Sequence, residues 1–414
     1  MFDLVDSLRK TRNSGPIVEP EKITSVLFAQ TEECEELVLE AYRFEGIATP
    51  AVVNNDDAEI ADHVRHAEIE VVIVELNNSN DVSADAERIS HLLPNHASVI
   101  VIGSEDAIST IRNLKKIGFY YLFWPITKQE LIDFVRSVSE NRKRHSSRGP
   151  GQNRRAKYIS IIGSKGGVGA TFLSAEVAYQ LSEHKKSSVL VVDQNHSTGD
   201  LDIMMGIRDY ERRKVQKNEI SAVDSNLAQS LMFRQNNLLS VLSLASETVD
   251  NLALLEYTNS VVDYLANDVN FVIEDRSASV TFGLESDRFV EECDVIVLVM
   301  SASVSSVRDA ARMREKIKRI NTDDSLRLIL VMNHIVPRKS ETLTKEDAEA
   351  FLKQPIDIEI PFCEQLPTVI MDNKRIAKSA LKAAAPLHQL TSTILGEKAM
   401  TSKKRSLFSF AARG

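Results

Sequence analysis

The feature that most constrains the fold of this chain is a glycine-rich loop between a short apolar run and a helix-like segment. Residues 157–163 read KYISIIG, which is typical of a buried strand, and SKGGVGAT at 164–171 leads from it into an apolar segment. A strand that enters a tight glycine turn and leaves as a helix is a unit of a parallel α/β sheet. Glycines let backbone N–H groups turn inward, and the helix start adds the positive end of its dipole. The pattern predicts an α/β fold with an anion-binding turn.

The alternation of apolar runs with helix-like stretches continues along most of the chain. Runs rich in Val and Ile, separated by segments of helical periodicity, predict mostly parallel sheets with helices on both faces. The runs lie at residues 23–30, 47–53, 70–76, 98–104 and 120–124, and then at 157–163, 188–193, 238–245, 270–275, 294–300, 326–333 and 356–362. We therefore expect an α/β fold of two doubly wound parallel-sheet domains, of which the first is flavodoxin-like.

A basic stretch without periodicity separates the two domains. Residues 141–157 read NRKRHSSRGPGQNRRAK, which predicts a solvated linker, although contact with DNA or anionic lipid stays open. A second polar stretch, at 205–225, is predicted to be a surface excursion. The expected division is an N-terminal segment at 1–21, a degenerate receiver-like domain at 22–142, a basic linker at 143–156, a second domain at 157–398 and a basic and apolar tail at 399–414.

The composition excludes several classes of protein. The chain has 414 residues, is 43% hydrophobic and 26% charged, and carries a formal net charge of −9, a balance that argues against a nucleic-acid coat. No apolar run reaches the roughly 18 residues that span a bilayer, and the N-terminus lacks the apolar core of a signal peptide. The three cysteines lie far apart, which favours a reducing compartment. We expect a cytoplasmic protein.

Two acidic residues and a threonine are expected at one edge of the second sheet. Asp193 ends the run 188–193, and Asp275 ends the run 270–275. The C-terminal ends of parallel strands share the edge at which ligands bind, so both carboxylates are expected to face the loop. Thr171 offers a hydroxyl where phosphate-binding loops ligate Mg²⁺. A nucleotide with Mg²⁺ is the predicted ligand; the alternative is a turn that keeps its glycines for packing and aspartates that cap helices.

The string SKGGVGAT resembles the deviant Walker A motif of the MinD/ParA class of P-loop ATPases, which places an additional lysine early in the loop. Lys165 holds that position. Three further features are the receiver-like first domain, the string VLVVDQNHSTGDLDIMMGI after the loop, and the string DVIVLVMSASVSSVRDAARM further on. Through them the chain resembles the CpaE/TadZ family of pilus-assembly proteins over roughly residues 22–398. This resemblance implies an ATP-binding, dimerising scaffold or localisation factor for type IVb (Flp/Tad) pilus assembly, often at a cell pole.

The same resemblance implies roles for individual residues. Lys165, Asp193 and Asp275 would be catalytic, with Lys165 reaching the neighbour's phosphates in a homodimer that sandwiches ATP. Thr171, Asp193 and Asp275 would hold Mg²⁺. The residues that would contact the nucleotide are Lys165, Gly166, Gly167, Val168, Gly169, Ala170, Thr171, Phe172 and Asn333, the last at the adenine edge.

Three residues depart from the pattern of that class. Ser164 replaces the first glycine of the loop, Ala170 replaces the lysine that contacts the β- and γ-phosphates, and Asn195 replaces a second Asp that orients the attacking water. Losing one charge-assisted contact costs about 1.5–3 kcal/mol, or roughly 10- to 150-fold in affinity, which abundant ATP tolerates. Phosphoryl transfer depends on placed charge and orientation. We therefore expect ATP binding with slow or absent hydrolysis.

The first domain lacks the residues that phosphorylation of a receiver needs. Ala29 and Gln30 stand near the positions of the acidic pair, Glu75 ends the third strand in place of an aspartate, and Trp124 stands where a lysine is expected. Ser104 is the one switch position retained. We interpret the domain as a constitutive interaction or targeting module, with Glu75 as a permanent phosphate mimic as the alternative, and Trp124 as a packing or interface residue.

The tail and the resemblance suggest partners. Residues 401–414 read TSKKRSLFSFAARG, and basic residues beside bulky apolar ones suit an anionic membrane surface, although a disordered tail explains them equally. The expected partners are a second copy of the chain and a secretion ATPase or inner-membrane platform, at the periphery of the inner membrane or a cell pole. Two rival functions stay open: a ParA-like DNA-partition ATPase, and an interaction module that needs no nucleotide.

Overall fold

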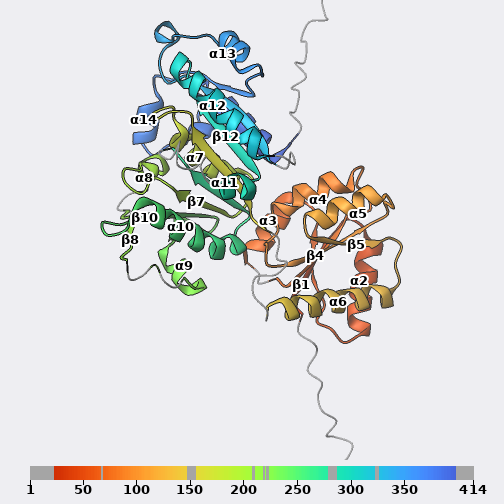
Figure 1. Ribbon diagram of the computed structural model, residues 1–414. Coiled ribbons are helices and arrows are strands. Elements are labelled where there is room, and N and C mark those ends of the chain that lie inside the picture. The colour runs from red at the N-terminus through yellow and green to blue at the C-terminus, as the bar shows by residue number, and fades with distance from the viewer. Residues whose placement is uncertain are drawn as a thin grey trace, which may run out of the picture. The chain divides into compact units, whose positions relative to one another are not determined.

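The computed structural model describes residues 23–66, 69–146, 155–207, 210–217, 220, 223–277, 287–321 and 326–397. The chain divides into two compact units, Met1–Arg155 and Ala156–Gly414 (Figure 1). The expected N-terminal segment and tail lie outside the described residues, as do residues 147–154 of the expected linker. Residues 143–146 of that linker belong to helix α6 (Lys128–Ser146), which therefore extends past the expected domain boundary. Along the described ranges, no helix combines the length and the hydropathy that crossing a membrane requires.

The first unit is a five-stranded parallel sheet in the order β2-β1-β3-β4-β5. This is the flavodoxin-like order, so the prediction for this domain is confirmed. The strands are β1 (Ser25–Ala29), β2 (Ala51–Asn54), β3 (Val71–Glu75), β4 (Ser98–Gly103) and β5 (Phe119–Phe123). The helices are α2 (Glu32–Phe44), α3 (Asp57–His66), α4 (Val82–Ser90), α5 (Ile108–Lys116) and α6.

Alternation along the central strand β3 explains why helices cover both faces of this sheet. Val71 and Ile73 enter a core cluster to which α2 and α6 contribute, and Val72 and Val74 enter a second cluster to which α3, α4 and α5 contribute. Successive side chains of a strand point to opposite faces, so an apolar run requires cover on both. Trp124 packs at the edge of the first cluster, as its interpretation as a packing residue predicts.

The second unit is a nine-stranded sheet in the order β14-β13-β12-β6-β11-β7-β10-β8, with β9 paired antiparallel to β10 and the other pairs parallel. The strands are β6 (Lys157–Gly163), β7 (Val189–Asp193), β8 (Arg213–Lys214), β9 (Phe233–Arg234), β10 (Leu239–Ala245), β11 (Phe271–Asp275), β12 (Val295–Met300), β13 (Arg327–Asn333) and β14 (Ile358–Ile360). The helices are α7 (Ala170–Tyr179), α8 (Leu201–Met205), α9 (Ser225–Leu231), α10 (Asn251–Leu265), α11 (Asp287–Glu292), α12 (Val304–Ile320), α13 (Lys345–Leu352), α14 (Leu366–Met371) and α15 (Ala384–Leu395). The predicted runs form the longer strands, and the two-residue strands β8 and β9 are additional.

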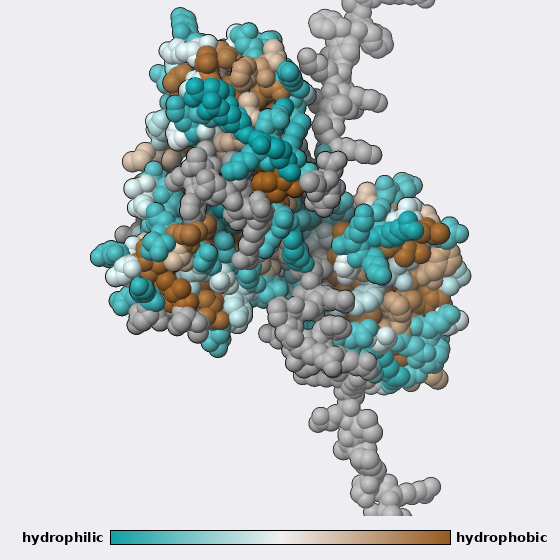
Figure 2. Space-filling view, in the orientation of Figure 1, coloured by the Kyte–Doolittle hydropathy of each residue, from teal (hydrophilic) through white to brown (hydrophobic). Residues whose placement is uncertain are grey.

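Two helices of this unit show how their sequences set their places. Helix α7 (ATFLSAEVAY) is apolar on most sides, and it packs against β6, β7, β11, α8 and α15, as a helix without a polar face must. Helix α12 buries Val307, Ala310 and Ile317 on one side. Its opposite side, rich in Arg, Lys and Glu, is hydrophilic in Figure 2. Strand β6 lies centrally between β11 and β12, so the loop that follows it leaves the middle of the sheet.

The predicted surface excursion at 205–225 is exposed at most of its described positions between 211 and 217, but it also contacts the sheet. Val215 is buried, β8 pairs with the end of β10, and Tyr210 packs edge-on against Phe233 with ring centroids 5.1 Å apart. Arg212 forms an ion pair with Asp193. The segment is polar because its charged side chains either bind the sheet edge or point to solvent, which composition alone does not distinguish.

Candidate functional site

The glycine-rich loop joins β6 to α7 and is fastened to its neighbours by Ser164. The N–H of Ser164 donates to the carbonyl of Val299 (2.8 Å), and Ser164 Oγ lies 2.7 Å from Ser306 Oγ in the first turn of α12. Gly167 and Gly169 have φ angles of 79° and 92°, a region that glycine enters without steric cost. The serine that departs from the usual motif therefore anchors the loop to α12.

The outer side of the loop is open. Lys165, Gly166 and Gly167 are exposed, and a Cβ added to Gly166 or Gly167 would meet no atom within 4 Å. Helix α7 begins immediately after Gly169 without a side-chain cap, so no capping side chain occupies its first-turn N–H groups. Backbone N–H groups at the start of a helix suit a phosphate. The donor set of the loop therefore fits the predicted nucleotide.

Three of the predicted nucleotide contacts bury their side chains. Val168, Ala170 and Phe172 are 2%, 3% and 6% exposed and belong to one apolar cluster. Only their backbone groups are available to a ligand at the loop. Compared with a lysine at this position, Ala170 adds buried apolar surface but provides no cation for the phosphates.

The side chain of Asp275 lies close enough to Thr171 for the hydroxyl to affect its pKa. Burial, which disfavours the charged form, raises the pKa of the Asp275 carboxyl to about 7; the nearby Asp193 adds to the rise, and the Thr171 hydroxyl opposes it. Strand register places Asp275 beside Asp193 on β7. A hydroxyl and carboxylates are ligands that Mg²⁺ accepts. No cluster of three or more His, Cys, Asp or Glu that could hold a metal occurs in the described part of the chain, so further oxygens would come from nucleotide or water.

Asp275 accepts the N–H (3.3 Å) and the Oγ (3.4 Å) of Ser277. Asp193 is engaged by more groups of the protein. Its Oδ1 accepts the N–H of Asn195 (2.9 Å), and its Oδ2 accepts Ser243 Oγ (3.0 Å) and Arg212 Nη2 (3.2 Å). Arg212 also donates to the carbonyls of Asn195 and Gly199. Burial raises the pKa of Asp193 and the Arg212 charge opposes that rise. The carboxylate thus fastens the loop after β7 to the 210–217 segment.

Sequence reasoning did not identify Arg212 or Ser243. Arg212 lies in a polar stretch, and Ser243 lies inside a strand, so neither carries a motif. The signal that could have identified Ser243 is its register, since β10 places it beside Asp193. No spacing pattern in the sequence indicates Arg212.

The two remaining predicted residues contact the loop or its rim. Lys165 Nζ donates to Ser305 Oγ (3.2 Å), in the first turn of α12. Asn333, 7% exposed, donates through Nδ2 to the carbonyl of Val168 (2.9 Å). A Cβ on Gly169 would collide with the Asn333 amide. Asn333 therefore supports the loop from the end of β13, and its role at an adenine edge stays a prediction.

The corresponding edge of the first unit is closed by Glu75. Its carboxylate is fully buried and accepts the N–H groups of Gln30 (2.7 Å) and Thr31 (2.9 Å), Thr31 Oγ1 (2.7 Å) and Asn77 Nδ2 (2.9 Å). Gln30 Oε1 in turn accepts the N–H of Asn78 (3.0 Å). The charge of Glu75 is therefore held inside the domain and is not displayed as a surface phosphate mimic would be.

A central strand that runs through a glycine-rich turn into a buried helix, with aspartates at the ends of two adjoining strands, defines an α/β domain of the P-loop class. Residues 159–380, more than half of the chain, match the family model described as the CobQ/CobB/MinD/ParA nucleotide binding domain. The chain belongs to this family.

Individual relatives match about half of the chain or somewhat more. The septum site-determining protein MinD of Helicobacter pylori is 24% identical over 250 residues, which are 58% of this chain and 91% of that protein. An uncharacterized ATP-binding protein of Methanocaldococcus jannaschii is 26% identical over 206 residues, which are 49% of this chain and 73% of that protein. Among solved structures, a ParA family ATPase of Chlorobium tepidum has a TM-score of 0.47 at 19% identity and covers 57% of this chain and 98% of its own.

Proposed function

We propose that the second unit binds ATP with Mg²⁺ as a conformational or dimerisation ligand and hydrolyses it slowly or not at all. The open glycine loop carries this proposal, since Gly166 and Gly167 leave free space above backbone donors at the start of α7. Membership of a nucleotide-binding family supports it, and the relative named as ATP-binding favours ATP.

The residues available to the ligand have distinct tasks in this proposal. The loop backbone and the start of α7 would hold the phosphates, and Lys165 would add a cation. Thr171 and Asp275 would hold Mg²⁺, which supplies charge neutralisation at the phosphates. Asp193, with both oxygens engaged by Asn195, Ser243 and Arg212, would reach the metal only through water or after losing Arg212.

The same residues explain why hydrolysis would be slow. Position 170 provides a buried methyl group where the class has a lysine, and Asn195 has no carboxylate with which to orient water. Phosphoryl transfer depends on charge and orientation at the transferring group. Binding depends on fewer contacts and tolerates the loss of one.

For the biological setting, we propose a scaffold or localisation factor for type IVb (Flp/Tad) pilus assembly that acts as a homodimer. The order of a receiver-like domain followed by a MinD/ParA-like domain supports this proposal. Its partners would be a secretion ATPase or an inner-membrane platform, at the periphery of the membrane or a cell pole. A ParA-like role on DNA is the alternative, and the net charge of −9 argues against it.

Nucleotide titration with a mass readout tests the proposal. We expect wild type to bind ATP–Mg²⁺ and to shift from monomer to dimer, and Lys165→Ala to bind more weakly and to stay monomeric. Exposed Lys318→Ala, on α12, is the matched control. Absence of binding at millimolar ATP–Mg²⁺ would contradict the nucleotide role, and brisk hydrolysis would contradict the sensing role. Steeply salt-dependent binding to nonspecific DNA would favour the ParA-like alternative.

A further inference from the structure

A second polar cavity lies in the nucleotide-binding unit, away from the phosphate loop. It has a volume of about 620 Å³, and none of the loop residues 163–172 lines it. Its walls come from the end of α7 and the π-helical residues that follow it, the connection between β9 and β10, and α14 with the segment after it. The lining residues are Tyr179, Glu183, Gln235, Asn236, Val369, Asn373, Lys374, Arg375, Lys378 and Ser379.

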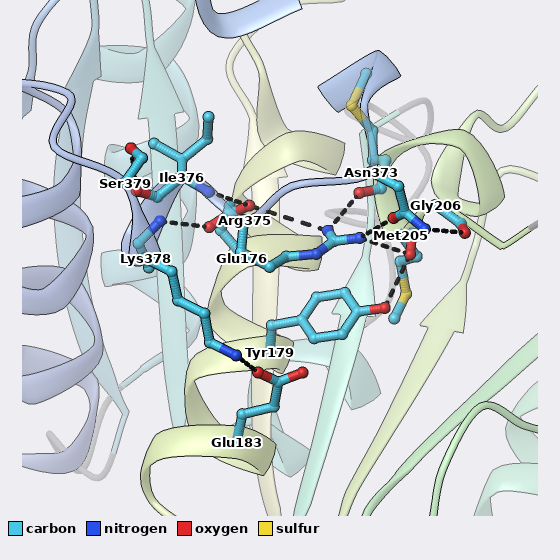
Figure 3. Close-up of polar contacts among 12 residues, drawn as sticks. Glu176, Tyr179, Glu183, Met205, Gly206, Asn373, Arg375, Ile376, Lys378 and Ser379 are labelled. Atoms are coloured by element: carbon cyan, nitrogen blue, oxygen red, sulfur yellow. Dashed lines mark hydrogen bonds and ion pairs between the residues drawn. The ribbon is translucent and has the colours of Figure 1, made fainter. Parts of the chain in front are cut away.

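Arg375 makes the floor of this cavity rigid. Its guanidinium donates to the carbonyls of Met204 (2.9 Å) and Met205 (2.8 Å) at the end of α8, and it lies 3.8 Å above the ring centroid of Tyr179 (Figure 3). The Tyr179 hydroxyl donates to the same Met205 carbonyl (2.8 Å). Cations at the last carbonyls of a helix are favourable. Arg375 therefore fixes three segments of chain around the cavity.

Glu176 fixes the adjoining backbone. Its buried carboxylate accepts the N–H groups of Ile376 (3.3 Å) and Ala377 (3.2 Å) (Figure 3). On the other side of Arg375, Asn373 donates to the carbonyl of Gly206 (3.2 Å). The backbone on both sides of Arg375 is thus attached to α7 and to the end of α8, so Lys374 and Lys378 extend from a preformed wall.

Cations outnumber carboxylates among the residues that line the cavity. Lys374, Arg375 and Lys378 line it with a single carboxylate, Glu183, on a chain whose net charge is −9. Arg375 lies 4.0 Å from the buried Glu176 carboxylate. Lys378 pairs with Glu183, and Lys374 pairs with Asp372. The two lysine side chains are 53% and 69% exposed, and exposed pairs are worth only about 0–1 kcal/mol. An incoming carboxylate can therefore take the place of either partner at small cost.

An apolar contact lies beside these cations. Val369 lines the cavity, and Met371, two residues further along the same helix, is 76% exposed. A flexible, exposed Met beside charged residues suits a surface that binds a peptide. A small anion would leave this methionine unused, whereas a peptide with acidic and apolar residues would contact both features.

We infer that this cavity is a docking site for an acidic peptide segment of a partner protein, with carboxylates at Lys374 and Lys378 and an apolar side chain at Met371. The site is separate from the phosphate loop and does not depend on the proposed nucleotide role. Its occupant is a protein segment, because the lysines and Val369 line one cavity and the exposed Met371 lies on the same helix as Val369.

Fluorescence anisotropy with a labelled synthetic peptide that repeats Glu-Leu-Glu-Gly tests the inference on the full chain. Lys374→Glu/Lys378→Glu should weaken binding about tenfold or more, since two charge-assisted contacts become repulsive. Lys318→Glu/Lys339→Glu, which reverses two exposed lysines outside the cavity, should leave binding unchanged. Met371→Ser should weaken binding several-fold, and the Gln-Leu-Gln-Gly peptide should bind poorly. Unchanged melting temperatures establish that the variants fold.

Three results would overturn the inference. Equal weakening by the two double variants would assign the binding to overall charge. Unchanged binding in Met371→Ser, with full displacement of the peptide by inorganic phosphate, would indicate a simple anion site. Equal binding of the Gln-containing peptide would remove the role of the lysines.

Discussion

Two aspartates at matching positions of neighbouring strands have different surroundings. Asp193 and Asp275 are paired by the register of β7 and β11. Asp193 is held by Arg212 as well as by Ser243 and Asn195, whereas burial raises the pKa of Asp275 to about 7. Side chains around each carboxylate, and not its place in a motif, therefore decide which one is available to an incoming cation.

Arg212→Ala is expected to destabilise the second unit by about 3 kcal/mol, because it leaves the Asp193 carboxylate buried without its counter-charge. Asp193 is 2% exposed as a side chain and Arg212 is 19% exposed. Urea unfolding measures the change in the free energy of unfolding. Arg213→Ala, the exposed neighbour, is the control and should change stability by less than about 0.5 kcal/mol. Equal effects of the two variants would show that the Asp193 pair is not structural.

Glu176 gives a pH dependence of stability. Burial raises its pKa above the ordinary value of 4.5, against the opposing effects of the Ala377 and Ile376 N–H groups and the Arg375 charge. Between 4.5 and the raised pKa, the folded state binds more protons than the unfolded state, so the free energy of unfolding falls as the pH rises. Wild type should therefore lose stability relative to Glu176→Gln across that window in urea titrations at several pH values. Exposed Glu256→Gln should run parallel to wild type, and a parallel Glu176→Gln curve would refute this account.

At the scale of elements, two glycines of the loop between β6 and α7 are needed for different reasons. Gly169 has a φ of 92° and a Cβ there would collide with Asn333, whereas Gly166 has open space at its Cβ position. Gly169 is therefore required by the fold, whereas Gly166 is free to contact a ligand. The sequence alone does not distinguish these two glycines.

Gly169→Ala is expected to lower the free energy of unfolding by about 1–3 kcal/mol, because alanine is strained at positive φ and displaces Asn333. Gly166→Ala should leave stability within about 0.5 kcal/mol of wild type but weaken ATP–Mg²⁺ binding, because its methyl group would stand on the open side of the loop. Denaturation and nucleotide titration on both variants distinguish the two effects. Undiminished ATP binding by Gly166→Ala would argue against the loop as the phosphate site.

In the first unit, one buried carboxylate joins two loops. Glu75 on β3 joins the β1–α2 turn, through Gln30 and Thr31, to the turn after β3, through Asn77. Glu75→Ala should cost about 2–3 kcal/mol in urea unfolding, because the partly buried N–H groups of Gln30 and Thr31 lose a charged acceptor. The exposed Glu36→Ala on α2 is the matched control. Acetyl phosphate should label neither wild type nor variant, and Mg²⁺-dependent labelling of the domain would overturn the interpretation as a constitutive module.

The features that the sequence predicts correctly are those determined by residues close together in the chain. Runs such as 71–74 are apolar on both faces, so β3 and its helical cover follow from periodicity. The glycine loop follows from a local pattern, and so does the placement of Asp275 at a strand end. Arg212 on Asp193 and Asn77 on Glu75 depend on side chains that meet only after folding. The contacts of Tyr210 with Phe233 and of Arg212 with Asp193 were missed for the same reason.

At the scale of the whole molecule, each unit has cores of its own. The clusters of the first unit draw on residues between Ile23 and Val138, and those of the second draw on residues between Ala156 and Leu395. A core that is complete within one segment is the physical requirement for independent folding. We therefore expect each of the two α/β units to be stable on its own.

Separate expression of residues 1–155 and 156–414 tests this independence. Each fragment should unfold cooperatively in urea, with a midpoint close to one of two transitions in the full chain. The reason is that, in the described part of the chain, no core cluster draws residues from both units. Glu75→Ala should then shift only the transition of the first fragment, and Arg212→Ala only that of the second. A fragment without a cooperative transition, or a variant that shifts both transitions, would mean that one unit depends on the other for its stability.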